Sequence, residues 1–229
     1  MAELRWATGF LDSPSRAAEE FWCAVTGSTL SARRDGGRFV TLVPPDGDAY
    51  LRMQVTDAGG PPSCHVDLHG VAVPAGATVV REQGDLVVCR SPAGLSFCVV
   101  AAGGSYVRPS AVDGALVDQV CLDLPADVYE AEAAFWTSVT GSVRRASDLA
   151  EFEVLERREG LALRFLLQRT GGAVPGMHLD FAAVDVAATV ARHVELGAVV
   201  VRRVPGQWTT LRDPVGREYC VTARSPVLS

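Results

Sequence analysis

The stretch Phe21-Trp22-Cys23-Ala24-Val25-Thr26-Gly27-Ser28 returns 114 residues later as Phe135-Trp136-Thr137-Ser138-Val139-Thr140-Gly141-Ser142. Three further blocks return in the same order: residues 51–54 at 165–168, 65–68 at 178–181, and 91–99 at 213–221. Ordered repetition over a long period indicates two tandem copies rather than a solenoid of short repeats.

The duplication predicts how the 229 residues divide. Each copy has about the length of a small domain. Between the copies lies a segment of small, Gly-rich and Pro-containing sequence, which is typical of a linker. We therefore expect a first domain over residues 1–103, a linker over 104–115 and a second domain over 116–229.

The second copy shows the same order of elements twice. Alternating apolar residues predict a strand over 120–124, and apolar residues at helical spacing predict a helix over 127–139 that Asp127 caps. Three β-rich runs follow this helix. The order then returns as a strand over 177–181, a helix over 185–196 and three strands over 198–204, 208–212 and 218–223. Each copy is therefore expected to contain two βαβββ modules.

The first copy is shorter in its second module. The offset between matched blocks rises from 113 to 122, so nine residues are missing there. Pro74 and the short connection leave no room for a helix, and we expect the first copy to have lost it. In the second copy, the Val186, Val190 and Val194 stripe predicts the buried face of the helix over 185–196. We expect His193, off that stripe, to be solvated.

Composition excludes several classes of protein. Hydrophobic residues make up 48% of the chain and charged residues 21%, which is typical of a globular protein. The net charge of −6 gives no whole-chain attraction to nucleic acid or to an anionic membrane, so neither is an expected partner. The start of the chain lacks the pattern of a signal peptide, and the six cysteines form no CxxC pair. We expect reduced thiols and a cytoplasmic location.

Four motifs in this order resemble the vicinal oxygen chelate superfamily, which includes glyoxalase, bleomycin-resistance proteins and extradiol dioxygenases. They are FWxxxTG at the end of the first helix, HLD opening the second module, a helix ending in LGA and DPxGxEYC at the close. The resemblance implies an α+β fold of tandem glyoxalase-like domains, each with paired βαβββ modules in a curled mixed sheet. In that superfamily the resulting cup holds a divalent metal or a bulky ligand.

The resemblance also implies where metal ligands would lie, on the first and last strands of the modules. His178 keeps the family's spacing to the helix-capping Asp185, although a His that only hydrogen-bonds in a polar cup remains an alternative. The family's closing Glu position is Cys220 here, and Glu218 lies two residues earlier on the same strand face. With Gln119 on the opening strand, the candidate metal set is His178, Glu218 and Gln119, for zinc, nickel or iron.

Other residues of the second copy are candidates for a bound small molecule. Gln168 and its counterpart Gln54 can hydrogen-bond a ligand, and Trp208 can stack on an aromatic one or form the wall of the cup. Cys220 is a soft ligand or a small buried filler. Asp180, together with Glu218, is the candidate catalytic base, although it can instead orient the cup through hydrogen bonds.

The first copy offers fewer of the implied ligands. It retains His65, but Ser96 stands where the second copy has Glu218, and Cys98 occupies the family's Glu position. We interpret this copy as structural or ligand-shaping, without a metal of its own. The chain also lacks the two-His-one-carboxylate triad of an extradiol dioxygenase.

Two functions follow from the residues and the resemblance. The first is a glyoxalase-like protein that binds a small hydrophobic or aromatic molecule in a cup with a degraded metal site. The alternative is a divalent-metal-dependent lyase or isomerase of glyoxalase type that acts in the second domain. A small-molecule ligand is the expected partner, and the chain is expected to act as a monomer with intrachain domain pairing or as a homodimer.

Overall fold

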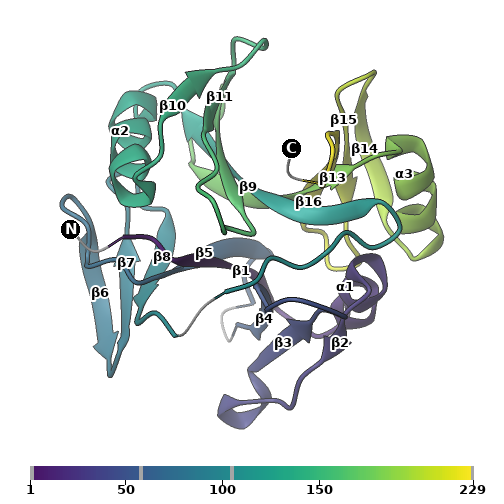
Figure 1. Cartoon of the computed structure of the whole chain (residues 1–229), viewed down its shortest axis with the longest axis horizontal. Helices are drawn as coiled ribbons and strands as arrows, with labels where there is room; N and C mark the ends of the chain where they lie inside the picture. Colours follow the sequence, from purple (N-terminus) through teal and green to yellow (C-terminus); the bar gives the residue numbers. More distant parts are fainter. Residues whose placement is uncertain (1–2, 57–58, 104–105, 228–229) are drawn as a thin grey trace. The chain divides into compact units, whose positions relative to one another are not determined.

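The computed structural model describes residues 3–56, 59–103 and 106–227. Residues 104 and 105 of the predicted linker lie outside the described residues. The fold is α+β, with one eight-stranded mixed sheet formed by each half of the chain (Figure 1). This confirms the fold class that the repeat and its motifs predict.

The first half contributes the sheet with strand order β2-β3-β4-β1-β5-β8-β7-β6. Its elements are β1 (Trp6–Ser13), α1 (Glu19–Thr26), β2 (Thr29–Leu30), a 3-10 turn η1 (Asp35–Gly37), β3 (Phe39–Val43), β4 (Leu51–Val55), β5 (Ser63–His69), β6 (Thr78–Gln83), β7 (Leu86–Arg90) and β8 (Ser96–Val100).

The second half contributes the sheet with strand order β10-β11-β12-β9-β13-β16-β15-β14. Its elements are β9 (Ala115–Pro125), α2 (Tyr129–Thr140), β10 (Arg144–Ala146), β11 (Phe152–Leu155), β12 (Arg164–Thr170), β13 (Gly176–Ala183), α3 (Val186–Glu195), β14 (Val199–Val204), β15 (Trp208–Arg212) and β16 (Glu218–Ala223).

The same parallel pair recurs in the two sheets and positions the candidate site. In the first half β5 pairs with β8, and Asp67 faces Cys98 in the register. In the second half β13 pairs with β16, and Asp180 faces Cys220. The duplication therefore preserves an Asp beside a Cys at the same place in each sheet.

Strands pair within each half, but the compact units of the chain draw on both halves. One unit comprises Met1–Gly9, His65–Val107 and Val120–His178, and the other comprises Phe10–Cys64, Arg108–Gln119 and Leu179–Ser229. We call them the first and second units. The predicted boundaries at 104–115 concern the sequence repeat and stay a prediction.

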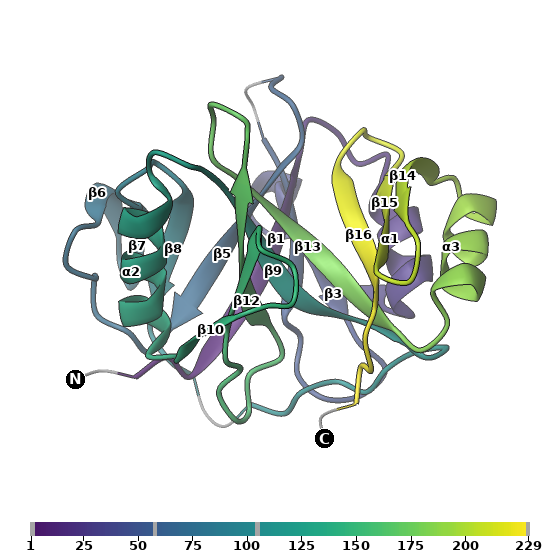
Figure 2. The same ribbon diagram turned by 90° about the horizontal axis from the view of Figure 1, so that it is seen from above.

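The second unit is built around Trp22 of α1. Its ring stacks on Phe181 of β13 at 6.1 Å between centroids and lies 5.3 Å from the Tyr219 ring of β16. A helix of the first half thus packs on strands of the second half, beside α3 (Figures 1 and 2). The Trp22 side chain is fully buried.

The first unit has the reciprocal arrangement around Trp136 of α2. The Phe97 ring of β8 lies 5.5 Å from the Trp136 ring and 5.8 Å from that of Phe135. A helix of the second half therefore covers a strand of the first half (Figure 2). The FW dipeptide that reveals the duplication is the apolar contact that each helix makes with the other half, and burial of such rings stabilises the unit.

The predicted helix near residue 185 is confirmed, but its buried face is not the predicted one. The helix is α3, and the Asp185 carboxylate caps it by accepting a hydrogen bond from the backbone N–H of Ala188 at 2.9 Å. The interpretation of His193 as solvated is wrong, because its side chain is fully buried and Val194 is exposed. His193 is buried because it packs in a cluster of aromatic rings whose residues are far apart in the sequence.

Two other local predictions have different outcomes. The prediction that Asp127 caps α2 is wrong, because the N-cap is Val128 and no side chain bonds the first turn. At the other end, α2 stops at Gly141, with the left-handed φ of 63° that favours glycine. In the first half, residues 70–77 form a bend and a turn between β5 and β6, with no helix. No helix of the described chain is long and apolar enough to cross a membrane.

Candidate functional site

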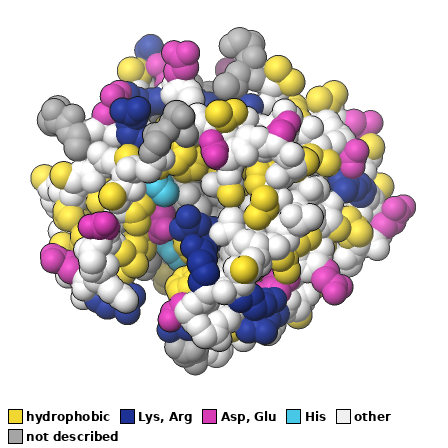
Figure 3. Space-filling model, turned by 60° about the horizontal axis from the view of Figure 1, so that its bottom comes forward, with side chains coloured by type: hydrophobic (Ala, Val, Ile, Leu, Met, Phe, Trp, Pro, Cys, Tyr) yellow, Lys and Arg dark blue, Asp and Glu magenta, His cyan; other side chains and the backbone are white. Residues whose placement is uncertain are grey.

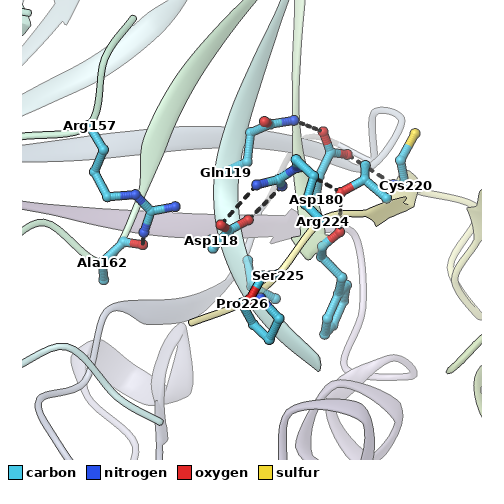
Figure 4. Close-up of polar contacts among 12 residues, drawn as sticks. Asp118, Gln119, Arg157, Ala162, Asp180, Cys220, Arg224, Ser225 and Pro226 are labelled. Atoms are coloured by element: carbon cyan, nitrogen blue, oxygen red, sulfur yellow. Dashed lines mark hydrogen bonds and ion pairs between the residues drawn. The ribbon is translucent and has the colours of Figure 1, made fainter. Parts of the chain in front are cut away.

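Asp180 on β13 is the centre of a buried polar cluster in the second unit. One carboxylate oxygen accepts a hydrogen bond from the side-chain amide of Gln119 at 2.6 Å, and the other accepts one from the backbone N–H of Cys220 at 3.0 Å (Figure 4). Asp180 and Gln119 are both buried. Because each oxygen already has a protein donor, the carboxylate is held in one orientation without a ligand.

Cys220 lies beside Asp180 in the parallel β13–β16 register and faces Thr210 across the antiparallel β15–β16 pair. Its sulfur is 3.4 Å from the Thr210 hydroxyl oxygen. The structure thus brings together three candidates that were predicted separately from the sequence, Asp180, Cys220 and Gln119. The hydroxyl of Thr210 was missed by the sequence analysis, although the alternation of β15 places it on the same face as Trp208.

Trp208 begins β15 and faces Thr222 of β16 in the register. Its side chain is partly exposed, and the Arg202 guanidinium lies 5.9 Å from the ring centroid. The other three tryptophans of the chain are buried. Trp208 is therefore the indole that a molecule in solution can reach.

Glu218 occupies the first position of β16 and has a half-exposed side chain. Its carboxylate pairs with Arg212 at 2.5 Å across the end of the β15–β16 hairpin. Gln54 lies on β4 opposite Phe39, half-buried, in the same unit. The metal set of His178, Glu218 and Gln119 stays a prediction, with Gln119 engaged by Asp180 and Glu218 by Arg212.

His178 belongs to the first unit, where it meets a second polar cluster. Ligand atoms of His178, Cys121 and Asp123 lie within 4.8 Å of one another, and the His178 Nε2 is 3.6 Å from the Asp123 carboxylate. Cys121 also lies 3.7 Å from the Gln168 side-chain oxygen. Asp123 was missed, although the alternation of β9 puts it on one face with Cys121.

The first half carries a third polar cluster, also within the first unit. A ring nitrogen of His65, a carboxylate oxygen of Asp67 and the Cys98 sulfur lie within 4.8 Å of one another. The His65 Nε2 to Asp67 Oδ1 distance is 3.9 Å. The prediction that this half lacks a metal of its own stays a prediction.

A partly buried ion pair supports the cluster around Asp180 from the other face of β9. The Arg224 guanidinium donates two hydrogen bonds to the buried Asp118, at 2.6 and 3.0 Å (Figure 4). Arg224 also donates to the Thr222 hydroxyl, which in turn donates to the Phe181 carbonyl at 2.7 Å. These hydrogen bonds connect β9 to β13 and β16. They hold the strand that carries Gln119 in position beside Asp180.

One face of the molecule carries positive and negative side chains side by side. On the face drawn in Figure 3, Arg side chains are interspersed with Asp and Glu. Mixed signs at short spacing cancel at a distance in physiological salt. This face is not the continuous basic surface that nucleic acid requires.

A family model for the glyoxalase-like domain matches residues 10–100 and 119–222, which covers both halves of the chain. The chain belongs to the glyoxalase-like domain family. The two matched segments coincide with the two sheets, so this glyoxalase-like chain is a tandem member of the vicinal oxygen chelate superfamily. No curated protein sequence matches it.

Solved structures share the fold of this glyoxalase-like chain at low sequence identity. The Mn(II)-bound glyoxalase from Novosphingobium aromaticivorans matches with a TM-score of 0.66 and 15% identity, over 96% of this chain and 81% of that one. Homoprotocatechuate 2,3-dioxygenase from Brevibacterium fuscum, as its E323L mutant, matches with 0.66 and 13%, over 98% and 72%. A halotolerant catechol dioxygenase matches with 0.63 and 12%, over 96% and 87%. These likenesses show the fold alone.

The family's divalent metal can be tested against the donors in the glyoxalase-like chain. The two clusters of the first unit each offer imidazole nitrogen, carboxylate oxygen and thiolate sulfur. Such a set suits zinc and related borderline ions better than magnesium or calcium. Each cluster has a single His, which differs from the facial triad of two His and one carboxylate. The chain therefore has groups that could hold a divalent metal, with a donor set of its own.

Proposed function

We propose that the chain binds a small hydrophobic or aromatic molecule on the face of the second sheet that carries Trp208 and Cys220. The observation that carries this proposal is the hydrogen bonding of Asp180. Both carboxylate oxygens accept bonds from protein donors, Gln119 and the Cys220 backbone. A polar set satisfied in this way supports a site that needs no metal to keep its shape.

The residues around this cluster suit such a ligand. Trp208 offers an accessible aromatic face. Thr210 and Cys220 offer a hydroxyl and a thiol in contact with each other. Gln54, in the same unit, is the further amide group that we propose contacts a ligand, since an amide both donates and accepts. Gln168 belongs to the first unit and stays a prediction.

A fluorescence titration tests the proposal. Binding of the neutral aromatic probe 2-naphthol quenches tryptophan emission, by contact at the accessible Trp208 and by energy transfer from the three buried tryptophans. We expect saturable quenching and a calorimetric binding signal, both reduced at least about tenfold in affinity by Trp208→Leu, a loss of at least about 1.4 kcal/mol. Trp208→Phe is the matched control that keeps an aromatic wall and retains the calorimetric signal. Equal binding by wild type and Trp208→Leu would contradict the proposal.

A second candidate, a metal-dependent lyase or isomerase, is favoured by the cluster of His178, Cys121 and Asp123. These residues would hold a divalent zinc, nickel or iron ion, which would supply Lewis acidity toward a substrate carbonyl. The bases predicted from the sequence, Asp180 and Glu218, belong to the second unit and stay a prediction. Stoichiometric bound metal that disappears in His178→Ala would support this candidate over the first.

A further inference from the structure

A tyrosine of the segment between β8 and β9 packs against the start of β1 in the first unit. Tyr106 lies outside any helix or strand, and its ring stacks on that of Trp6, with 4.9 Å between centroids and 6° between the ring planes. Trp6 is only 1% exposed, whereas Tyr106 is partly exposed. Tyr106 therefore covers an indole face on which another aromatic ring could stack.

The phenolic hydroxyl of Tyr106 lies against a buried polar pair of the same unit. Its oxygen is 3.2 Å from Nδ1 of His69 on β5, and Nε2 of that imidazole is 3.0 Å from the Thr8 hydroxyl oxygen. The backbone N–H of Gly103 donates to the Tyr106 oxygen at 2.8 Å, so the hydroxyl proton can be donated to Nδ1. All three contacts are satisfied when Nε2–H donates to Thr8 and Nδ1 accepts from Tyr106.

The second half of the chain shows that the fold does not require an imidazole at this position. His69 follows the HVDL block directly, and the residue that follows the matching HLDF block is Ala182. Ala182 is fully buried on β13, so the second sheet is built there with a methyl group. The polar group of the first sheet is thus specific to this half, beside the segment that carries Tyr106.

The residues beneath Tyr106 suit one chemical class of molecule. The face of Trp6 favours an aromatic ring, and the imidazole of His69 favours a hydroxyl group on that ring, which can donate to Nδ1. The contact with Thr8 holds the imidazole in the orientation that this hydrogen bond needs. An aromatic molecule with a hydroxyl group, a phenol, meets both requirements, as the side chain of Tyr106 does.

We propose that Trp6, Thr8 and His69 form a binding site for a phenolic molecule, and that Tyr106 occupies this site as an internal ligand when no such molecule is bound. A tethered group competes with a dissolved ligand at an effective concentration on the order of millimolar. A phenol from solution therefore binds by displacing Tyr106. The site goes beyond the proposed function, which concerns the second unit and Trp208.

Calorimetry with 4-methylphenol, which is the tyrosine side chain as a separate molecule, tests the site. All chains carry Trp208→Leu, so that the proposed site of the second unit does not contribute. We expect Tyr106→Ala to bind 4-methylphenol at least about tenfold more tightly than the chain that keeps Tyr106, because the internal competitor is gone. Toluene, which has the same ring without the hydroxyl, should bind this variant at least about tenfold more weakly than 4-methylphenol.

Two further variants show which groups recognise the ligand. His69→Leu, added to Tyr106→Ala, should remove the preference for 4-methylphenol over toluene, because the acceptor for the hydroxyl is lost. Val107→Ala is the matched control, since Val107 is the exposed neighbour of Tyr106, and it should leave the affinity for 4-methylphenol unchanged. Equal affinities of the Tyr106→Ala chain for 4-methylphenol and toluene would overturn the proposal, because they would show an apolar cavity without recognition of the hydroxyl.

Displacement is measured separately, in the chain that keeps Tyr106, by hydrogen exchange of the Gly103 amide. Because this N–H donates to the Tyr106 hydroxyl, excess 4-methylphenol should accelerate its exchange, and excess toluene should not. Unchanged exchange in excess 4-methylphenol would overturn the proposal, whether or not the Tyr106→Ala variant folds. The 2-naphthol titration in chains that keep Trp208 tests the proposed function, so failure of one proposal does not imply failure of the other.

Discussion

The indole N–H of Trp22 donates a hydrogen bond to the Asp213 carboxylate at 2.9 Å, across 191 residues of sequence. Trp22 belongs to the first half and Asp213 to the closing DPVG turn of the second. Asp213 also accepts hydrogen bonds from the backbone N–H groups of Val215 and Arg217. The turn that the motif predicts is therefore completed by a helix from the other half.

The reciprocal contact in the first unit uses a different carboxylate. The corresponding turn has Ser91 in place of Asp213, and Glu132 of α2 occupies the role. Glu132 accepts a hydrogen bond from the Trp136 indole at 2.9 Å and from the Ala93 backbone N–H at 2.6 Å. The carboxylate belongs to the turn in the second unit and to the helix in the first. In both units it connects the helix and the turn by hydrogen bonds.

Trp22→Phe is expected to destabilise the second unit by about 2–4 kcal/mol. The change leaves a cavity and removes the N–H donor to Asp213. Urea unfolding followed by circular dichroism measures the loss. Trp208→Phe, at a partly exposed indole, is the control and should cost less than about 1 kcal/mol. Equal losses from the two changes would contradict this account of Trp22.

Asp213→Asn is expected to cost more, about 3–5 kcal/mol. The Arg217 and Asp213 side chains are almost fully buried, with 2.8 Å between them, and removing one partner leaves an unpaired buried charge. Arg217 also donates hydrogen bonds to the carbonyls of Asp12 and Ser63. A displaced Arg217 side chain would therefore also lose its contacts with β1 and β5. The double variant Asp213→Asn with Arg217→Met should recover part of the loss in the same unfolding experiment. A double variant no more stable than the single one would argue against the buried charge as the cause.

Gln119→Leu is expected to destabilise the fold by about 1–3 kcal/mol, because it leaves an oxygen of the buried Asp180 without its amide donor. Gln119→Glu should cost more at neutral pH, since it places two carboxylates in contact, and its extra cost should shrink as the pH falls. Unfolding free energies at pH 7 and pH 5 distinguish the two variants. A Gln119→Glu variant as stable as wild type at pH 7 would mean that the Asp180 contact contributes little.

His193 predicts an acid sensitivity of the second unit. Burial, followed by the nearby charge of Arg192, lowers its pKa to about 4, and its Nδ1 lies 3.0 Å from the Tyr219 hydroxyl oxygen. Below the ordinary pKa of about 6.5 the unfolded chain takes up a proton that the folded chain does not. The free energy of unfolding should therefore fall between pH 6.5 and pH 4, by about 3 kcal/mol in total from this residue.

The double variant His193→Leu with Tyr219→Phe isolates this contribution, because it removes both partners of the hydrogen bond. Its free energy of unfolding, measured against pH, should fall less steeply than that of wild type between pH 6.5 and pH 4. The difference in slope should approach one proton. Parallel curves for the two proteins would show that His193 does not carry the acid sensitivity.

The sequence alone determined the duplication, the fold class and the order of the strands along the chain. These follow from local patterns, namely repeated blocks, alternation and helical spacing, which depend on near neighbours. It also identified Asp180 and Cys220 as separate candidates, each from its own motif, whereas the structure shows that they are neighbours in the β13–β16 register. Asp185 as a helix cap is local for the same reason.

Tertiary structure decided which helix covers which sheet, and with it the burial of His193. The apolar faces of α1 and α2 fit either half equally well by pattern, since hydrophobic burial is not directional. Only the assembled fold shows that Trp22 meets Asp213 and that His193 lies 4.9 Å from the Phe181 ring. The clusters of potential metal ligands that include Asp123 and Asp67 also depend on side chains that converge from separate strands. Periodicity along one strand carries no information about the distances between those side chains.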